Sequence, residues 1–82
     1  MDVNYRGRHD IISEILEICA DGYHSKTHIM FDAHISYGQL KQYLALLQQK
    51  TFLNMNSEGK FKTTDRGNKF LNVFREIQTL MG

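Results

Sequence analysis

Apolar residues recur along much of this chain at intervals of three and four positions, the spacing of one face of an α-helix. In residues 8–20 they form a broad stripe that is ended by Asp21 and Gly22. A second long run, residues 65–80, follows Thr64, a residue type that caps helix N-termini. The pattern therefore predicts one helix near the start of the chain and one near its end.

Two shorter helices are predicted between these. Residues 26–33 fill only about two turns, so this helix depends on packing against the rest of the protein. Ser36 and Gln39 have the spacing of a capping box, in which two residues bond each other's backbone amides, and they predict a helix over residues 37–49. Only a short connection remains between the two helices.

A hairpin completes the pattern. Residues 52–55 and 60–63 have strand character, and residues 56–59 are of the types that tight turns prefer. The element order is that of a helix-turn-helix followed by a wing, residues 52–63. We therefore predict an α+β, mostly α, winged helix-turn-helix fold with a three-helix core, a two-stranded wing and a C-terminal helix. Residues 1–82 are expected to form one domain.

The composition is that of a globular domain, with 41% hydrophobic and 23% charged residues. No stretch approaches the roughly 18 apolar residues that span a bilayer, and the N-terminus lacks the pattern of a secretory signal. Cys19 falls among the apolar residues of the first helix, as is typical of a core residue in a reducing compartment. We expect a soluble cytoplasmic protein without a membrane partner.

The predicted helix over residues 37–49 has an outer face suited to DNA, because it carries neither large apolar nor acidic residues. A single helix fits the major groove, while the helix before it crosses the backbone and the wing reaches phosphates. The same polar face is also what a merely solvated helix presents, so the surrounding architecture decides between the two interpretations. We expect double-stranded DNA to contact Lys26, Thr27, Ser36, Tyr37, Gly38, Gln39, Lys41, Gln42, Ala45, Gln49, Lys60 and Lys62.

The residues of this predicted interface have different expected roles. Gln42 can bond adenine in a bidentate fashion, and Lys41 can reach a guanine or a phosphate. Lys60 and Lys62 alternate with an apolar residue, so both are expected to point away from the core. The formal net charge is only +1 and Glu58 lies at the wing tip, so we expect a modest affinity that falls with salt.

The histidines raise the hypothesis of a metal site, because His24 and His28 are four positions apart. No Cys-x-x-Cys or His-Glu-x-x-His pattern accompanies them, so we expect no metal and interpret the histidines as facing solvent or phosphate. The chain also has no glycine-rich phosphate loop and no serine elbow. We therefore expect no cofactor and no enzymatic activity.

Across the two short helices, the chain resembles a known family. Residues 26–37 read KTHIMFDAHISY and residues 39–44 read QLKQYL, similar to the pattern K-T-x-I-M-x-x-A-N-L-S-Y-x-Q-L-x-x-Y-L of small archaeal winged-helix proteins. The likeness continues into residues 10–16 and into residues 61–67, which are similar to the family's Y-x-x-T-x-x-G step from strand to helix. The resemblance thus covers nearly the whole chain.

This resemblance implies a winged-helix fold and a role as a transcription regulator. The family includes ten-kilodalton chromatin-associated members that dimerise through a long C-terminal antiparallel coiled coil, which implies a nucleoid-associated location. The chain departs from the family at His34, where asparagine is common, and its last helix ends at Gly82, shorter than in the coiled-coil members. Apolar residues still continue along the last helix, so we expect a homodimer through it.

Three functional interpretations remain open at this point. The first is a transcriptional regulator that recognises a defined DNA sequence through Lys41, Gln42 and their neighbours. The second is an architectural protein that binds any duplex through its lysines. The third is a protein-interaction module, which the near-neutral charge and the apolar C-terminal residues favour.

Overall fold

The computed structural model describes residues 6–82, and residues 1–5, the start of the predicted domain, lie outside the described residues. Its elements are α1 (Arg8–Ile18), α2 (Lys26–Ala33), α3 (Tyr37–Gln49), β1 (Leu53–Met55), β2 (Phe61–Thr63) and α4 (Asp65–Met81). Within residues 6–82 the fold is α+β and mostly α, as predicted. Helices α2 and α3 form the helix-turn-helix, and the antiparallel hairpin is the wing.

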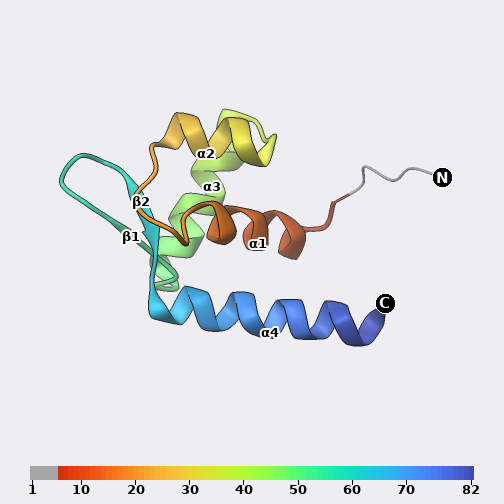
Figure 1. The fold of residues 1–82 in the computed structure, drawn as a ribbon. Coiled ribbons are helices and arrows are strands. Elements are labelled where there is room, and N and C mark those ends of the chain that lie inside the picture. Colours follow the sequence, from red (N-terminus) through yellow and green to blue (C-terminus); the bar gives the residue numbers. More distant parts are fainter. Residues whose placement is uncertain (1–5) are drawn as a thin grey trace.

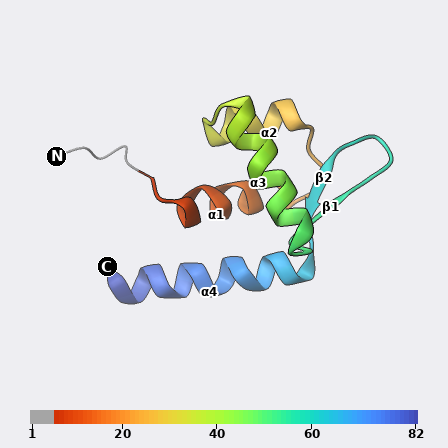
Figure 2. The same ribbon diagram turned by 180° about the vertical axis from the view of Figure 1, so that it is seen from behind.

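Helix α1 lies between the other helices, with α2 and α3 on one side and α4 on the other (Figure 1). Seen from behind, α3 crosses α1 and leads into the wing (Figure 2). The core joins these layers: Ile15 of α1, Leu40 of α3 and Phe61 of β2 are almost completely buried in one apolar cluster. Helix α4 contributes Leu71, which is 2% exposed. Burial of this surface is the main stabilising term of such a fold.

Side-chain caps fix where the two helices of the motif begin. The Ser25 hydroxyl accepts a hydrogen bond from the His28 amide at 3.2 Å, at the start of α2. At the start of α3, the Ser36 hydroxyl accepts from the Gln39 amide and the Gln39 side-chain oxygen accepts from the Ser36 amide, each at 3.1 Å. The predicted capping box is thus confirmed.

Helix α1 ends at Ile18, two residues before the predicted end at residue 20. The Ala20 amide donates to the Glu17 carbonyl at 3.2 Å, a bond three residues back that tightens the last turn. Gly22 then adopts a φ of 152°, which leads the chain away from the helix axis.

Helix α2 ends in a left-handed residue. His34 has φ 55° and ψ 50°, a conformation that glycine and asparagine adopt most readily. This is the position where asparagine is common in the resembled family, so the family preference has a backbone cause. Arg6 donates to the carbonyls of Ala33 at 2.7 Å and His34 at 3.0 Å, and it forms an ion pair with Glu14 at 2.6 Å. The guanidinium thereby satisfies carbonyls that the helix end leaves free.

Both strands of the wing are one residue shorter than predicted. Phe52 lies in the connection between α3 and β1, where its amide donates to the Leu47 carbonyl of α3 at 2.8 Å. Lys60 belongs to the turn, because its amide donates to the Asn56 side chain at 3.0 Å. Gly59, with φ 76°, supplies the left-handed residue that this hairpin turn requires.

The wing has a third backbone partner that the sequence did not predict. The His24 amide donates to the Phe61 carbonyl at 2.9 Å, and the Phe61 amide donates to the His24 carbonyl at 2.8 Å. On its other side Phe61 pairs with Met55. The loop that precedes α2 is therefore fixed to the base of the wing.

Gly67 brings α4 against the connection between α3 and the wing. The Thr64 hydroxyl caps α4 by accepting from the Gly67 amide at 3.1 Å, and it donates to the Thr51 carbonyl at 2.6 Å. A methyl group at position 67 would collide with the carbonyl oxygen of Phe52 and lie 2.7 Å from Thr63 Cγ2. The T-x-x-G step of the sequence thus has a packing cause: a side chain does not fit here.

Candidate nucleic-acid interface

The outer face of α3 is exposed, and α3 contains no acidic residue. Leu40, Leu44 and Leu47 point into the core, whereas every residue of the predicted interface is exposed. Tyr37 is 55% exposed, and Lys41 Nζ lies 5.7 Å from the centroid of its ring. A cation near an aromatic ring is attracted by the electron-rich face, so the ring positions the ammonium group at the surface.

A shallow hollow of about 200 Å³ connects four elements, α2, α3, β1 and β2. Its lining residues are Lys26, Lys41, Leu44, Ala45, Gln48, Met55 and Phe61. Three residues of the predicted interface, Lys26, Lys41 and Ala45, therefore surround one concave surface, together with residues of both strands of the wing. Gln48 and Met55, which the prediction did not include in the interface, also belong to it.

Gln42 faces a different hollow from Lys41. This second hollow, of about 210 Å³, is lined by Arg8, Gln42, Tyr43 and Leu46. Arg8 is a cation that the sequence did not assign to the interface, because only the packing of α1 against α3 brings it there. Gln39 is exposed, but its side-chain oxygen is engaged in the cap of α3. The predicted α3 residues are thus not equally placed to contact one ligand.

The two lysines of the wing differ in their surroundings. Lys62 Nζ lies 5.8 Å from the centroid of the Tyr23 ring, whereas Lys60 Nζ lies 3.8 Å from a carboxylate oxygen of Glu58. Glu58 therefore offsets part of the charge of Lys60. Tyr23 is 43% exposed and was missed by sequence reasoning, because it reaches the wing only through the backbone pairing of the following residue with β2.

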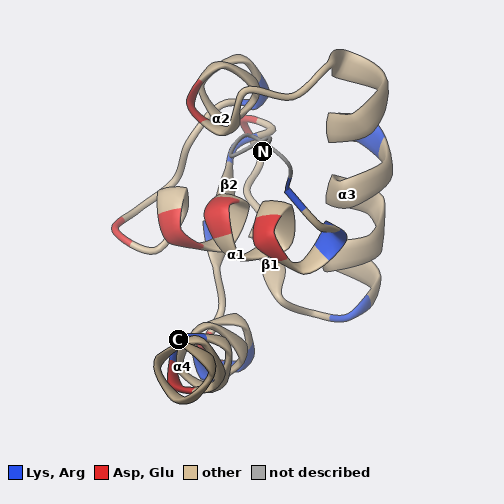
Figure 3. Ribbon diagram, turned by 90° about the vertical axis from the view of Figure 1, so that its right-hand side faces the viewer, with Lys and Arg blue, Asp and Glu red and all other residues tan. Residues whose placement is uncertain are grey.

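The charges are separated between helices. Asp10, Glu14 and Glu17 all lie on α1, and Figure 3 shows acidic positions along α1 but only basic ones on α3. Glu14 is paired with Arg6, and Glu17 with Arg75 at 2.7 Å. The acidic side of the molecule is therefore partly neutralised internally, while α3 carries the exposed cation Lys41 and no acidic residue.

Comparison with known proteins agrees with this geometry. A sequence model of winged helix-turn-helix proteins matches residues 5–82. The chain belongs to the winged helix-turn-helix family. An uncharacterized protein of the archaeon Methanocaldococcus jannaschii is 32% identical over 76 residues, which are 93% of this chain and 77% of that protein. The crystal structure of Sso10a-2, a DNA-binding protein from Sulfolobus solfataricus, matches with a TM-score of 0.81 and 24% identity over 93% of this chain and 82% of that chain.

These findings confirm the predicted fold class and the resemblance to archaeal winged-helix proteins. Over residues 6–82, this winged-helix protein has no helix that is long and apolar enough to cross a membrane.

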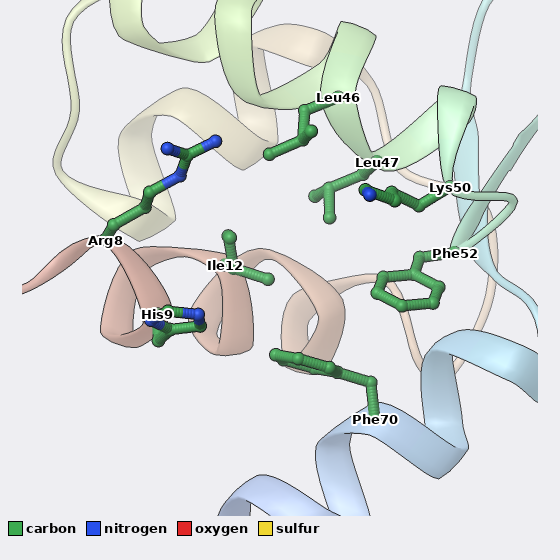
Figure 4. Close-up of a pocket in the computed structure, with 8 residues that line it drawn as sticks. All are labelled: Arg8, His9, Ile12, Leu46, Leu47, Lys50, Phe52 and Phe70. Carbon is green, nitrogen blue, oxygen red and sulfur yellow. The ribbon is translucent and has the colours of Figure 1, made fainter.

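A second surface of this winged-helix protein lies between α1 and α4. Two hollows of about 260 and 380 Å³ share His9 and Phe70 and continue along α4. Figure 4 shows the first, with Ile12 of α1 and Leu47 of α3 above the ring of Phe70. The second continues past Phe70 along the apolar side chains Val73, Phe74 and Ile77. This groove is mainly apolar, unlike the surface around Lys41.

Cys19 has no exposed surface. Burial, and secondly the negative charge of Asp21, raise the pKa of the Cys19 thiol to about 12. The thiolate is the reactive form of cysteine, so this thiol stays protonated and unreactive at neutral pH. The prediction that Cys19 is a core residue is confirmed.

Proposed function

We propose that this protein binds double-stranded DNA, with α3 in the major groove and the wing on the backbone. The observation that supports this most is the hollow that joins Lys26, Lys41 and the wing along the acid-free face of α3. In winged helix-turn-helix proteins the second helix of the motif enters the groove. The structural neighbour Sso10a-2, described as a DNA-binding protein, supports the same role for this chain.

The contacts divide by type. Lys26 lies at the start of α2, where helix amides favour a phosphate, and the exposed Lys60 and Lys62 would contact the DNA backbone beside the wing. Lys41 and Gln42 are the candidates for reading base edges. The remaining exposed positions then flank the groove or let the backbone approach closely: Thr27, Ser36, Tyr37, Gly38, Gln39, Ala45 and Gln49.

The proposed biological role is transcriptional regulation on the nucleoid, in the cytoplasm, without enzymatic activity. Regulation by such domains requires only that they occupy DNA, and the surface around α3 offers hydrogen-bonding and cationic groups of the kind that do this. The buried, protonated Cys19 thiol is not a nucleophile, in agreement with a binding role.

Fluorescence anisotropy with a labelled random-sequence duplex tests the proposal. Four lysines per chain, Lys26, Lys41, Lys60 and Lys62, predict a slope of log affinity against log salt near −3.6 for each bound chain, so affinity should fall at least about 100-fold between about 50 and 200 mM salt. The double variant Lys41→Ala, Gln42→Ala should bind about 10-fold more weakly or worse. The matched control Lys69→Ala, Gln78→Ala removes the same two residue types from exposed positions on α4 and should bind like the wild type.

Two results would contradict this assignment. Equal loss in both double variants would mean that only net charge matters and that α3 is not the recognition helix. No binding by the wild-type protein at tens of micromolar in the lower salt would exclude the DNA-binding proposal and favour the protein-interaction module.

We also propose that the protein is a homodimer through α4. Val73 and Ile77 are 54% and 51% exposed, and Leu80 and Met81 are 82% and 83% exposed. Contiguous apolar surface of this kind marks an association site, and it adjoins the apolar groove between α1 and α4. A dimer would double the phosphate contacts and add steepness to the salt dependence.

Sedimentation equilibrium checks the dimer. Ile77→Lys should shift the mass from dimer to monomer, because a charge would be buried without a partner. The neighbouring exposed residue gives a control, Gln78→Lys, which should stay dimeric. A wild-type monomer at high micromolar concentration would refute the dimer without affecting the DNA-binding proposal.

Architectural DNA binding is the second candidate function. It is favoured by the small number of candidate base-reading groups on α3, since the Gln39 side chain is held in the helix cap. Selection from a random DNA library separates the two roles. A defined motif supports regulation, whereas equal affinity for unrelated duplexes supports architectural binding.

A further inference from the structure

Four side chains at the start of α2 form one continuous series of contacts. Asp21 Oδ1 lies 2.8 Å from His24 Nε2, His24 Nδ1 lies 3.4 Å from His28 Nδ1, and His28 Nε2 lies 2.7 Å from Asp32 Oδ2. The two imidazole rings meet edge to face, with centroids 4.8 Å apart and an angle of 87° between their planes. Neither histidine was assigned a role in the proposed DNA interface.

With both imidazoles neutral, the hydrogens of these four groups do not complete the series. An ionised carboxylate can only accept, so each Nε2 must carry a hydrogen to bond its aspartate. A neutral imidazole has one N–H, so both Nδ1 atoms are then left with lone pairs. While both rings are neutral, the Nδ1 atoms of His24 and His28 therefore lie 3.4 Å apart with no hydrogen between them. Two acceptors in this arrangement favour a cation that both can bind.

We propose that His24 and His28 form a two-imidazole binding site for a divalent transition metal, with Zn²⁺ as the best geometric fit. Two nitrogens bound to zinc at about 2.0–2.1 Å in a tetrahedral arrangement are about 3.3–3.4 Å apart. The observed separation of the two Nδ1 atoms is 3.4 Å. The pair therefore already has the spacing of one edge of a zinc tetrahedron.

The two aspartates, Asp21 and Asp32, lie where they can hold the orientation of the two imidazole rings. Histidines that bind metals usually donate their other N–H to a carboxylate, which fixes the ring and raises its basicity. Asp21 and Asp32 do this for the two rings. Each imidazole ring is therefore held in the tautomer that carries its hydrogen on Nε2 and leaves Nδ1 free to bind a metal.

The site supplies only two ligands from this chain. Among residues 6–82, no group of three or more His, Cys, Asp or Glu side chains is arranged to hold a metal. The remaining positions therefore fall to water or to donors of another molecule, as in sites that keep open positions. Imidazole ligands favour zinc, nickel and copper over the oxygen-preferring magnesium and calcium.

A metal at this site would connect two parts of the proposed DNA surface. The His24 backbone is paired with Phe61 of the wing, and His28 lies in the first turn of α2, two residues after Lys26. A bound cation would brace α2 against the wing and add positive charge near Lys26, which should strengthen DNA binding. This consequence rests on the proposed function, whereas metal binding itself does not.

Isothermal titration of the untagged protein with Zn²⁺ tests the site, with Mg²⁺ as the metal that should not bind. We expect one Zn²⁺ to bind per chain. The affinity for Zn²⁺ should fall about 100-fold in His28→Asn and about 10-fold in Asp32→Asn. The matched control is His34→Asn, which also removes one exposed imidazole and places a residue that tolerates the left-handed conformation there. Circular dichroism verifies that each variant is folded.

Nitrogen-15 NMR of the imidazoles provides a readout that does not depend on DNA. Before zinc is added, the nitrogen-15 chemical shifts of both rings should show a protonated Nε2 and an unprotonated Nδ1. After zinc is added, the chemical shifts of both Nδ1 atoms should change. No binding at millimolar zinc, or an affinity that His28→Asn leaves unchanged, would overturn the proposal. Equal loss in His34→Asn would do the same. If zinc binds but DNA affinity is unchanged, the metal site stands and only its link to the proposed function fails.

Discussion

The junction between α3, the wing and α4, which includes Thr51, Thr64 and Gly67, is polar in sequence, and so is the outer face of α3. The junction residues pack against other parts of the chain, whereas the outer face of α3 is exposed. At the junction, Gly67 touches the carbonyl of Phe52, and the Thr64 hydroxyl bonds two backbone groups. On α3, Gly38 has no other heavy atom closer than 4.0 Å to where a Cβ would lie, and Lys41 is exposed. The first region therefore determines stability, while the second is free to serve binding.

The largest expected contrast is between two glycines. Gly67→Ala should destabilise the fold by about 3 kcal/mol or more, because the methyl group overlaps a backbone carbonyl that cannot move without displacing the wing. Gly38→Ala should instead stabilise it by about 0.5–1 kcal/mol, since alanine is the better helix former at an open position. Urea unfolding at a fixed protein concentration measures both. A tolerated Gly67→Ala would show that the two regions do not differ as described.

The next contrast separates stability from binding. Leu71→Ala removes a side chain that is 2% exposed, so the free energy of unfolding should fall by about 2–5 kcal/mol while the folded protein keeps its DNA affinity. Lys41→Ala should leave unfolding within about 0.5 kcal/mol and reduce the salt slope of DNA binding by about 0.9. Urea denaturation gives the free energy of unfolding of each variant, and fluorescence anisotropy at two salt concentrations gives the DNA affinity and salt slope of each. Loss of DNA affinity by folded Leu71→Ala would mean that the regions are coupled.

Local signals in the sequence were sufficient for the fold. Capping by Ser36 and Thr64 acts within one turn, and the leucines of α3 repeat at helical spacing, so neighbouring residues alone predict these helices. The errors lie at ends that tertiary contacts set. The Phe52 amide bonds back to the Leu47 carbonyl of α3, while the Phe52 carbonyl accepts from the Thr64 amide next to the wing, and nothing near Phe52 in the sequence indicates the first bond.

The candidate site was less predictable, because it depends on contacts between distant segments. The exposure of Lys41 follows from helical spacing, but Tyr23 and Arg8 reach the interface only after α1 and the wing have packed. The spacing of His24 and His28 was visible in the sequence, but their 3.4 Å approach was not. His24 precedes the helix, so helical geometry says nothing about where its ring lies.

The smallest contrast is between two residues with left-handed backbones, Thr51 at the junction and His34 in the turn of the motif, with φ 59° and 55°. Thr51→Gly should stabilise the protein by about 1 kcal/mol, because a β-branched residue is most strained in this region and glycine is not. His34→Gly should stabilise the protein by only about 0.5 kcal/mol. Histidine tolerates the left-handed conformation better than threonine does, and glycine adds chain entropy to the unfolded state.

A matched control adjoins the first site. Lys50 has φ −80°, so Lys50→Gly relieves no strain and should destabilise the protein by about 0.5–1 kcal/mol through backbone entropy. Thermal unfolding of the three variants at one concentration ranks them, because effects of this size shift the midpoint by several degrees in a domain of this length. If His34→Gly gained more than Thr51→Gly, the turn of the motif would be the more strained region. The junction would then owe its importance to the contact at Gly67 rather than to its backbone.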